Sequence, residues 1–438
     1  MTLSHDNDDK NDFHSHHSND ITIGENVRTS DVEKNSIEKE KYEANADVEE
    51  VHGRSKEEDD YPDGMCNTFA TFGYVNSWGI FQSYYEETLI PNTPPSNIAW
   101  IGSIQYSLVF FPALIVGRLF DLGYFRSIFL PSSAILVVAT FLAAECKEYW
   151  QLLLCQGLLV GFGCGGIFGP TTAIVAHWFK KRRGLAMGFI AIGSSLGGTL
   201  LPIAVKNLIP RVGFPWTMRI VGFILLAVLI ASNLLLDRRL PARKVSGGLL
   251  NLAAFKYAPY SIYCAAGFFT FLGIYTVLTY VSVSAAEIGI SDNFSFYSSL
   301  FGRYTAGNLC DRLGPMNVML PFTTCAAVLT YAWPFAQTKS SLIAVTIIYG
   351  FSSGVYVSLL SNPLMEMGET YDVGRRIGMF LTITAFGALI GPPISGAINT
   401  ATGNFKAVGY YAGSAALIGV VLMLITRHLI LRRIFGKL

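Results

Sequence analysis

Apolar runs separated by short polar turns fill the chain from residue 62 to residue 430. The clearest run, Gln151 to Phe179, contains no Asp, Glu, Lys or Arg and is long enough to cross a hydrocarbon core of about 30 Å as a helix. Four cations, Lys180 to Arg183, follow at once, and then a second apolar run begins. Because a four-cation turn does not cross a bilayer readily, the pattern predicts two membrane spans joined on the cytoplasmic side.

The same pattern predicts twelve spans in two groups of six. The first group is 65–85, 98–116, 127–144, 151–179, 185–205 and 216–236, and the second is 260–285, 294–309, 318–336, 342–365, 377–398 and 407–430. We therefore expect an all-α membrane protein with an N-terminal six-helix half (62–236), a cytoplasmic connection (237–257), a C-terminal six-helix half (258–430) and a cytoplasmic tail (431–438). Residues 1–61 have almost no large apolar side chains and are predicted to be a disordered cytoplasmic tail.

Lysine and arginine residues gather in alternate loops, on the side that receives the four-cation turn. Positively charged loops remain in the cytoplasm, so both termini of this multi-pass protein are predicted to be cytoplasmic. The plasma membrane is the favoured location, and the vacuolar membrane is the alternative.

Composition agrees with a membrane protein and excludes several other classes. Hydrophobic residues make up 51% of the chain and charged residues only 14%. The net charge of +1 gives no case for a nucleic-acid partner. The seven cysteines lack CxxC spacing and are interpreted as free thiols, so no metal site or cofactor is expected. No loop carries a nucleophile, base and orienting group together, so no catalytic residue and no enzyme activity is predicted.

Two loop motifs repeat after the second and eighth predicted spans. Their residues are Gly117, Asp121, Gly123 and Arg126 in the first and Gly307, Asp311 and Arg312 in the second, with a further basic pair, Arg375 and Arg376, before the eleventh span. Each motif offers a glycine, where helices can approach, followed by a carboxylate at the cytoplasmic face. Such a carboxylate can hold the ends of adjacent helices in one conformation and release them in another. A plain turn with charges that set the topology is the alternative interpretation.

These motifs resemble the signature of the major facilitator superfamily between helices 2 and 3 and between helices 8 and 9. The resemblance extends from about residue 61 to the end of the chain. Within the superfamily the chain looks like the fungal monocarboxylate-porter-like branch. The residues that carry this likeness are Asp63-Gly64, the segments 72–82 and 178–198, and Phe301-Gly302-Arg303.

The resemblance implies a solute site near the bilayer midplane, between the two halves. It implies that Arg303, an ionisable residue within a span, meets a substrate carboxylate. The alternative is that Arg303 reaches the cytoplasmic interface by snorkelling. Neutral candidates for the substrate path are Tyr74, Asn76, Ser77, Gln82, Tyr275, Tyr280 and Tyr356, with Gln105 and Tyr106 in the second span. Each of these could instead bond one helix to another.

The chain departs from the animal proton-coupled monocarboxylate carriers that it resembles. Trp78 lies near the position of their buried lysine, and Ser299 stands where their helix 8 has an aspartate. No buried acid is then left to carry a proton, which argues against proton symport. Helices 1 and 8 also look shortened, since Gly64 and Phe72 are only eight positions apart and the eighth predicted span has about 16 residues. An incomplete gene model or a degenerate paralogue would explain both.

The sequence thus predicts a secondary transporter of a small organic solute, favoured to be a monocarboxylate-like organic anion, that works by alternating access. An exporter of a fungal secondary metabolite is the alternative, and a non-transporting nutrient receptor is less favoured. The lipid bilayer is the other expected partner. The coupling ion is left open, with the proton as one candidate.

Overall fold

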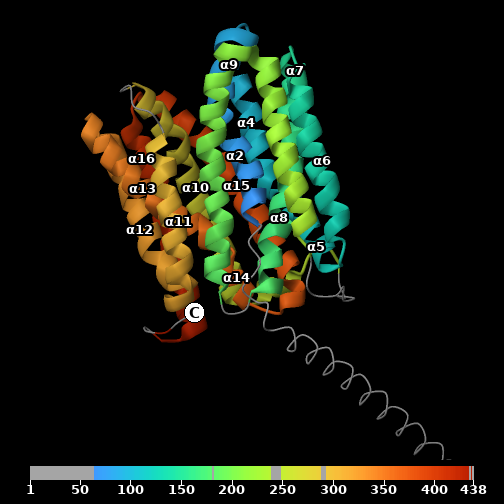
Figure 1. Ribbon diagram of the computed structural model, residues 1–438. Coiled ribbons are helices and arrows are strands. Elements are labelled where there is room, and N and C mark those ends of the chain that lie inside the picture. The colour runs from blue at the N-terminus through green and yellow to red at the C-terminus, as the bar shows by residue number, and fades with distance from the viewer. Residues whose placement is uncertain (1–63, 180–181, 238–247, 288–292, 434–435, 437–438) are drawn as a thin grey trace, which may run out of the picture. The chain divides into compact units, whose positions relative to one another are not determined.

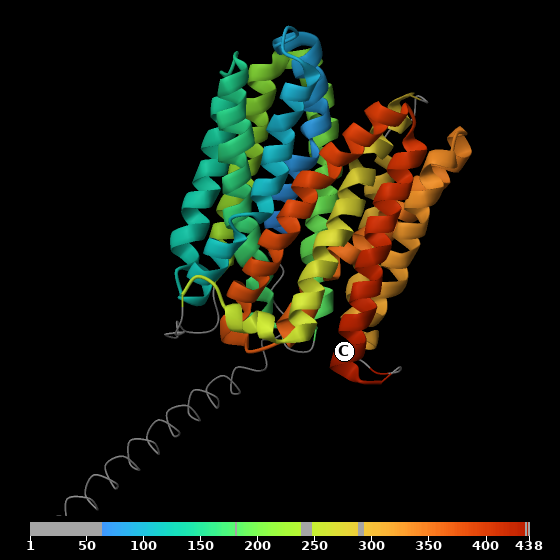
Figure 2. The ribbon, with the colours of Figure 1, turned by 180° about the vertical axis from the view of Figure 1, so that it is seen from behind.

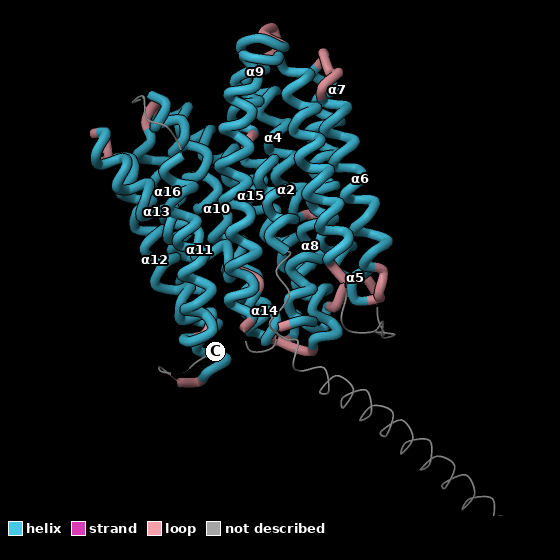
Figure 3. The backbone as a smooth tube through the Cα atoms, in the orientation of Figure 1, coloured by secondary structure: helices cyan, strands magenta, loops and turns pink. Residues whose placement is uncertain are grey.

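Helices provide the regular secondary structure of the described residues, which are 64–179, 182–237, 248–287, 293–433 and 436 of a computed structural model (Figure 1). These residues contain no strand, as the backbone tube in Figure 3 shows. The predicted disordered tail, 1–61, lies outside the described residues, as do residues 238–247 of the predicted connection and residues 434–435 and 437–438 of the predicted C-terminal tail.

The first group of helices follows the first six predicted spans. Its elements are α2 (Gly64–Asn76), α3 (Trp78–Tyr84), the π-helical turn η2 (Tyr85–Leu89), α4 (Pro95–Phe110), α5 (Ala113–Asp121), α6 (Phe125–Ala143), α7 (Tyr149–Leu152), the π-helical segment η3 (Leu153–Leu159), α8 (Val160–Trp178) and α9 (Arg183–Leu235). The first predicted span is divided at Ser77, between α2 and α3. The fourth runs without a break from Tyr149 to Trp178, two residues from its predicted start and one from its predicted end.

Two predicted spans, 185–205 and 216–236, lie in the single element α9. This helix has 53 residues, and Gly213 adopts a φ of 77° inside it. That conformation is accessible to glycine at little steric cost, and the nearby Pro210 and Pro215 remove backbone donors. α9 is therefore two arms that meet at a sharp bend, which the hydrophobic pattern resolves as separate spans.

The second group begins with the short 3₁₀ turn η4 (Leu252–Lys256). Its other elements are α10 (Ala258–Glu287), α11 (Asn293–Leu313), α12 (Pro315–Ala332), η5 (Trp333–Phe335), α13 (Lys339–Leu359), α14 (Asn362–Glu366), η6 (Thr370–Asp372), α15 (Val373–Thr402) and α16 (Phe405–Leu431). α11 has 21 residues, more than the span predicted at 294–309. The helix continues to Leu313. The predicted span ended earlier because Asp311 and Arg312 are charged and interrupt the apolar run.

Nine helices of the described residues are long and apolar enough to cross a membrane, and α9 holds two predicted crossings. α11 and the divided first span are not among the nine. At 21 residues α11 is nevertheless about 30 Å long, the thickness of a bilayer core. The helices are consistent with twelve crossings, a number that stays a prediction.

Glycines allow the closest helix contacts in the first group. A Cβ atom on Gly73 of α2 would lie 2.7 Å from the Cα atom of Gly197 on α9, well inside van der Waals contact. A Cβ atom on Gly165 of α8 would overlap the carbonyl oxygen of Leu108 on α4. The glycine-dense runs therefore bring backbones together, as small residues do in membrane helices.

Large apolar side chains cover the outer helices. On α6, Leu130 and Val138 are 61% and 53% exposed, and on α16 Val421 and Leu424 are 53% and 50% exposed. An exposed apolar surface of this extent on a helix bundle matches hydrocarbon rather than water.

Three helix pairs make most of the contact between the groups: α11 with α9, α15 with α5, and α15 with α4. Figure 2 shows α15, in orange-red, passing between the two groups. α14 and the C-terminal ends of α5 and of α16 lie at one end of the bundle, opposite α7 (Figure 1). We call this end, which holds Asp121 and Asp311, the motif end.

Candidate functional site

Asp121 is the last residue of α5, and its carboxylate lies against the start of α15. Its Oδ1 accepts a hydrogen bond from the backbone N–H of Gly374 at 2.9 Å, and its Oδ2 accepts one from Arg375 at 2.7 Å. The first N–H groups of a helix have no partner within the helix and lie at the positive end of its dipole. The Asp121 carboxylate, 1% exposed, satisfies two of them and so ties α5 to α15.

Asp311 makes the same arrangement between α11 and α9. Its Oδ1 accepts a hydrogen bond from the N–H of Gly184 at 2.8 Å, and its Oδ2 accepts one from Leu185 at 3.0 Å. Each motif carboxylate therefore caps a helix that belongs to the other group. Neither partner helix could be identified from the sequence, because the cap joins segments far apart along the chain.

The motif glycines lie beside these caps. A Cβ atom on Gly117 would overlap the carbonyl oxygen of Gly374, and one on Gly307 would lie 2.9 Å from the carbonyl oxygen of Gly184. A side chain at either position would push the two groups apart. The glycine and the carboxylate of each motif thus act on the same contact.

A polar network surrounds the start of α15. Arg375 Nε donates to Asp372 Oδ1 at 2.5 Å, and the side chains of this ion pair are only 6% and 15% exposed. The other carboxylate oxygen of Asp372 accepts from Asn251 Nδ2 at 2.8 Å, and Arg375 Nη1 donates to the carbonyl oxygen of Gly248 at 3.3 Å. The described end of the connection between the two groups is therefore bonded to the helix start that Asp121 caps.

The remaining motif residues lie outside the two caps. Gly123 follows α5 with a φ of 99°, a turn conformation suited to glycine. Arg126 pairs with Asp237 at 3.2 Å, with both side chains exposed, and Arg312 is exposed at the end of α11. Arg376 Nη2 donates to the carbonyl oxygen of Glu369 at 2.7 Å.

Arg303 lies where α11 meets α9, farther from the motif end than Asp311. Its Nη1 donates to the carbonyl oxygen of Ala191 on α9 at 2.7 Å, and its Nε donates to Ser299 Oγ at 3.0 Å. The side chain is half-buried and reaches the other group rather than the end of the bundle. In the described part of the chain, no carboxylate lies within ion-pair distance of this guanidinium.

Aromatic rings from both groups meet between α4 and α10. The Tyr106 and Tyr275 rings have centroids 5.9 Å apart, and those of Phe110 and Phe271 are 5.5 Å apart. Both pairs are edge-to-face, a favourable arrangement for aromatic rings. We call these four residues the aromatic bridge. Tyr275 and Arg303 are near enough for their charges to be coupled when both groups are ionised.

Four of the predicted neutral path residues lie in this region: Tyr106 and Tyr275 belong to the bridge, and Asn76 and Tyr356 lie beside it. Asn76 Oδ1 accepts a hydrogen bond from the Tyr106 hydroxyl at 2.9 Å. The Tyr356 ring lies 6.4 Å from that of Phe271. Together with Arg303, these residues come from both groups of helices and offer one cation, several hydroxyls and aromatic surface.

The structure places the other predicted path residues elsewhere. Tyr74 is fully buried within the first group, with its ring 5.8 Å from that of Phe81. The Ser77 hydroxyl donates to the carbonyl oxygen of Gly73 at 3.0 Å. Gln82 accepts from Trp78 Nε1 at 2.8 Å and donates to Glu86 at 2.9 Å. The Tyr280 hydroxyl donates to the carbonyl oxygen of Pro392 at 3.4 Å, toward the end opposite the motifs.

Phe110 and Phe271 are bridge residues that the sequence interpretation missed. They pair along their own helices with Tyr106 and Tyr275, four residues away in each case. Residues four apart lie on one face of a helix, so two such aromatic pairs in spans two and seven were the available signal.

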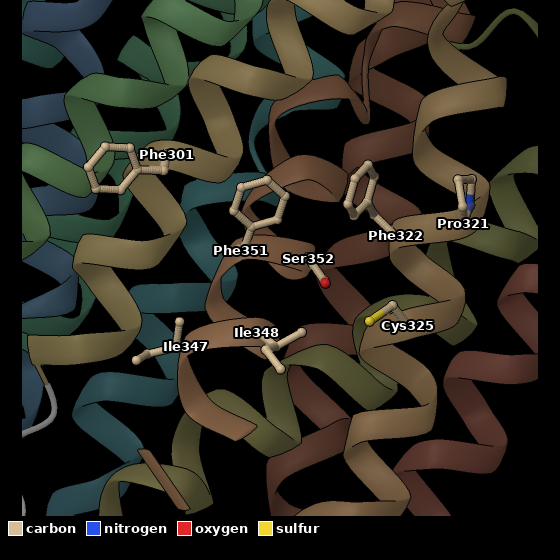
Figure 4. A pocket seen from close by; sticks show the side chains of 8 residues that line it. All are labelled: Phe301, Pro321, Phe322, Cys325, Ile347, Ile348, Phe351 and Ser352. Atoms are coloured by element: carbon tan, nitrogen blue, oxygen red, sulfur yellow. The ribbon is translucent and has the colours of Figure 1, made fainter. Parts of the chain in front are cut away.

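An apolar groove of about 430 Å³ opens on the outer side of the second group (Figure 4). Its walls come from α11, α12 and α13, and the residues that line it are Phe301, Pro321, Phe322, Cys325, Ile347, Ile348, Phe351 and Ser352. Phe301 is 66% exposed, whereas Arg303 on the next part of the same helix reaches α9. The groove therefore lies on the membrane-facing side, away from the bridge. Among the described residues no cluster of His, Cys, Asp and Glu could hold a metal ion.

Sequence comparison matches the chain to the Major Facilitator Superfamily over residues 65–283 and 258–432. Among its relatives, an MFS-type transporter of Ophiocordyceps sp. (strain BCC 1869) is 34% identical, and the match covers 83% of each chain. The aspyridones efflux protein apdF of Emericella nidulans is 33% identical, over 87% of this chain and 82% of that protein.

Solved structures give the same fold. The human organic anion transporter MFSD10 superimposes with a TM-score of 0.65 at 17% identity, over 82% of this chain and 97% of that one. The E. coli fucose:proton symporter FucP gives a TM-score of 0.66 at 15% identity, over 83% and 97% of the two chains.

Proposed function

The chain belongs to the major facilitator superfamily, and from this premise we propose that it exports an organic anion with an apolar, aromatic body by alternating access. It is a multi-pass membrane transporter. The proposal concerns the solute, the direction and the residues that act.

Arg303 is the observation that carries the anionic part of the proposal. A cation inside a membrane protein requires compensation, and two neutral oxygens supply only part of it. A carboxylate matches the planar donor fork of arginine and would supply the rest. The adjoining aromatic bridge offers flat apolar surface for the body of the solute.

The two motif carboxylates supply the gate. We assign the motif end to the cytoplasm, because the cationic turns lie there. Asp121 and Asp311 then hold the cytoplasmic ends of the two groups together, and their hydrogen bonds to the starts of α15 and α9 break when the site opens to the cytoplasm. Both termini are cytoplasmic in this assignment, and the plasma membrane is the favoured location.

The direction of transport is supported by a relative. The name of apdF describes efflux of aspyridones, and this chain is 33% identical to it. Uptake of a small monocarboxylate is the second candidate, because the sequence Phe301-Gly302-Arg303 in α11 resembles that of the monocarboxylate-porter-like branch. The aromatic bridge favours a larger, flat solute over a small one.

The test uses yeast cells that express the full chain and are preloaded with radiolabelled 2-naphthoate or its neutral amide, 2-naphthamide. We expect efflux of the carboxylate to exceed that of the amide and of cells without the protein. Arg303→Gln is expected to lower carboxylate efflux by about a hundredfold, the effect of removing one partner of a buried charged contact. Arg219→Gln is the matched control, since Arg219 pairs with the exposed Glu145 near the opposite end.

Two results would change the assignment. Accumulation of labelled pyruvate or lactate without efflux of naphthoate would favour uptake of a small monocarboxylate. Equal rates for the acid and the amide, or for wild type and Arg303→Gln at equal surface expression, would remove the anion from the proposal. Repeating the efflux measurement with the pH gradient collapsed reports whether protons are coupled to transport.

A further inference from the structure

Arg303 joins two elements as well as facing the proposed site. Its Nη1 bond to the carbonyl oxygen of Ala191 crosses from α11 to α9, so it links the two groups of helices. The same oxygen also accepts a hydrogen bond from the Ser194 hydroxyl at 2.9 Å. Ala191 therefore has a second donor within its own helix and does not lose all side-chain hydrogen bonding when Arg303 leaves.

Arg303 and Asp311 both hold α11 against α9. Along α11, Gly307 lies against Gly184 and Gly188 of α9, and Asp311 caps the start of α9. Arg303 extends this line of contacts toward the aromatic bridge. All of them must break together if α9 and α11 separate at the motif end.

We propose that the solute's carboxylate replaces the carbonyl oxygen of Ala191 as the hydrogen-bond acceptor of Arg303 and thereby weakens the α9–α11 contact. This rests on the function proposed above and adds what binding does to the gate. The carboxylate accepts two hydrogen bonds from the guanidinium fork, while a backbone carbonyl shared with Ser194 accepts one from it. Opening of the motif end to the cytoplasm and capture of the anion from the cytoplasm are then the same event.

The replacement of the Ala191 oxygen by the solute's carboxylate makes the affinity for the anion depend on whether α9 and α11 are in contact. When α9 and α11 are joined, the anion must displace Ala191, and when they are apart Arg303 is already free. The anion therefore binds the separated state more tightly, and a ligand shifts a conformational equilibrium by its difference in affinity between the two states. A neutral solute with the same aromatic body has no such preference.

Two pairs of exposed aromatic residues report whether the groups are in contact. Phe189 of α9 and Tyr304 of α11 have ring centroids 6.3 Å apart, and Phe111 and Phe386 at the α4–α15 contact have centroids 5.6 Å apart. All four side chains are 44% to 50% exposed, so replacing them leaves the buried contacts intact. Each pair is changed to cysteines in the full chain, with the seven native cysteines replaced, and the rate of cross-linking by a short bismaleimide is measured in lipid vesicles.

We expect 2-naphthoate to slow cross-linking of the Phe189–Tyr304 pair and to leave the Phe111–Phe386 pair, at the contact without Arg303, unchanged. 2-Naphthamide is expected to change neither rate. Arg303→Gln is expected to slow cross-linking without any solute, by about tenfold, which is the scale of one charge-assisted hydrogen bond. It also removes the response to naphthoate. In Arg303→Lys the ammonium still reaches the Ala191 oxygen as a donor, so we expect its solute-free rate to stay close to wild type.

Binding of labelled naphthoate to the same vesicles separates this proposal from the function on which it rests. If naphthoate binds through Arg303 but Arg303→Gln cross-links at the wild-type rate without solute, Arg303 does not hold α9 against α11. The proposal of this subsection is then wrong, while recognition of the anion by Arg303 is supported. If naphthoate does not bind at all, the proposed function itself is wrong. Folding of each variant is checked by its elution as a monodisperse peak in detergent.

Discussion

Two contacts between the helix groups, α5 with α15 and α11 with α9, have the same arrangement of residues. In each, a motif aspartate caps the start of the opposite helix, and a motif glycine lies against a glycine of that helix start. Gly117 and Asp121 have the same spacing as Gly307 and Asp311. This correspondence is expected of a transporter built from repeated halves.

The contacts differ in what reinforces them. Arg303 lies eight residues before Asp311, and the corresponding position before Asp121 is Ala113. The α9–α11 contact therefore has a cation that faces the proposed solute site. The α5–α15 contact has instead the buried ion pair of Arg375 with Asp372 at its motif end.

This difference divides the labour between the two contacts. The hydrogen bond from Arg303 to α9 can be exchanged for a hydrogen bond to a solute. The Arg375–Asp372 pair lies at the motif end, away from the aromatic bridge, so solute binding does not change it. The α9–α11 contact is thus the one that senses the solute, and the α5–α15 contact is the one that holds the groups in place when the other loosens. Six substitutions, grouped in four predictions, test the division, with the two cysteine pairs as reporters.

Removal of the motif carboxylates should have the largest effect. Asp121→Ala leaves two N–H groups of α15 without their partner in a site that is 1% exposed, and we expect the α5–α15 contact to weaken by about 3 kcal/mol. Asp311 is half-buried, so water can replace its carboxylate and Asp311→Ala should cost less. Cross-linking of the Phe111–Phe386 and Phe189–Tyr304 cysteine pairs measures each contact. Equal losses in both variants would show that burial does not distinguish the caps.

Added methyl groups at the motif glycines should come next. The Cβ of Gly117→Ala would overlap the Gly374 carbonyl oxygen, whereas that of Gly307→Ala would lie 2.9 Å from the Gly184 carbonyl oxygen and needs a smaller shift. We expect a cost of about 2 kcal/mol for the first and less for the second, as overpacking in a tight contact produces. Transport rates and the same cross-linking assays at equal expression provide the measurement. A Gly307 variant that is the more impaired of the two would contradict this order.

Much of this arrangement could be predicted from the sequence, because charge and spacing specify it. The repeated aspartates indicated helix-end contacts, and the fourth span was predicted to within two residues. The partner of each aspartate could not be predicted, since hydropathy does not say which helices of a bundle are neighbours. A helix that is apolar all round also gives no sign of which face meets another helix.

The first span shows how little the sequence says about which residues reach the aromatic bridge. Tyr74, Asn76, Ser77 and Gln82 were predicted together as path residues, yet only Asn76 reaches the aromatic bridge. With about 3.6 residues per turn, Tyr74 and Asn76 lie about 200° apart around the helix axis, so one helix cannot turn both toward the bridge. The composition of the span does not say which of these two sides faces the bridge.

Loss of the ion pair beside Asp121 should affect one contact only. Asp372→Asn keeps a side-chain oxygen for Arg375 or Asn251 but removes the charge, so we expect the α5–α15 contact to weaken by about 1.5 kcal/mol. The effect is moderate because Arg375 keeps two oxygen acceptors, the amide oxygen at position 372 and the carbonyl oxygen of Gly248. The Phe111–Phe386 pair should cross-link more slowly while naphthoate still slows the Phe189–Tyr304 pair. A lost response to naphthoate would mean that both contacts sense the solute.

Thr382→Val should have the smallest effect and bears most directly on the role of charge. The Thr382 hydroxyl donates to the carbonyl oxygen of Phe111 at 3.1 Å, which makes it the neutral counterpart of the bond from Arg303 to Ala191. Valine keeps the shape and removes the donor, so we expect the α4–α15 contact to lose about 0.5–1 kcal/mol and the response to naphthoate to persist. If Thr382→Val instead loosened the contact as much as Arg303→Gln loosens its own, a neutral hydrogen bond would suffice as a latch. The cation would then matter for binding the anion alone.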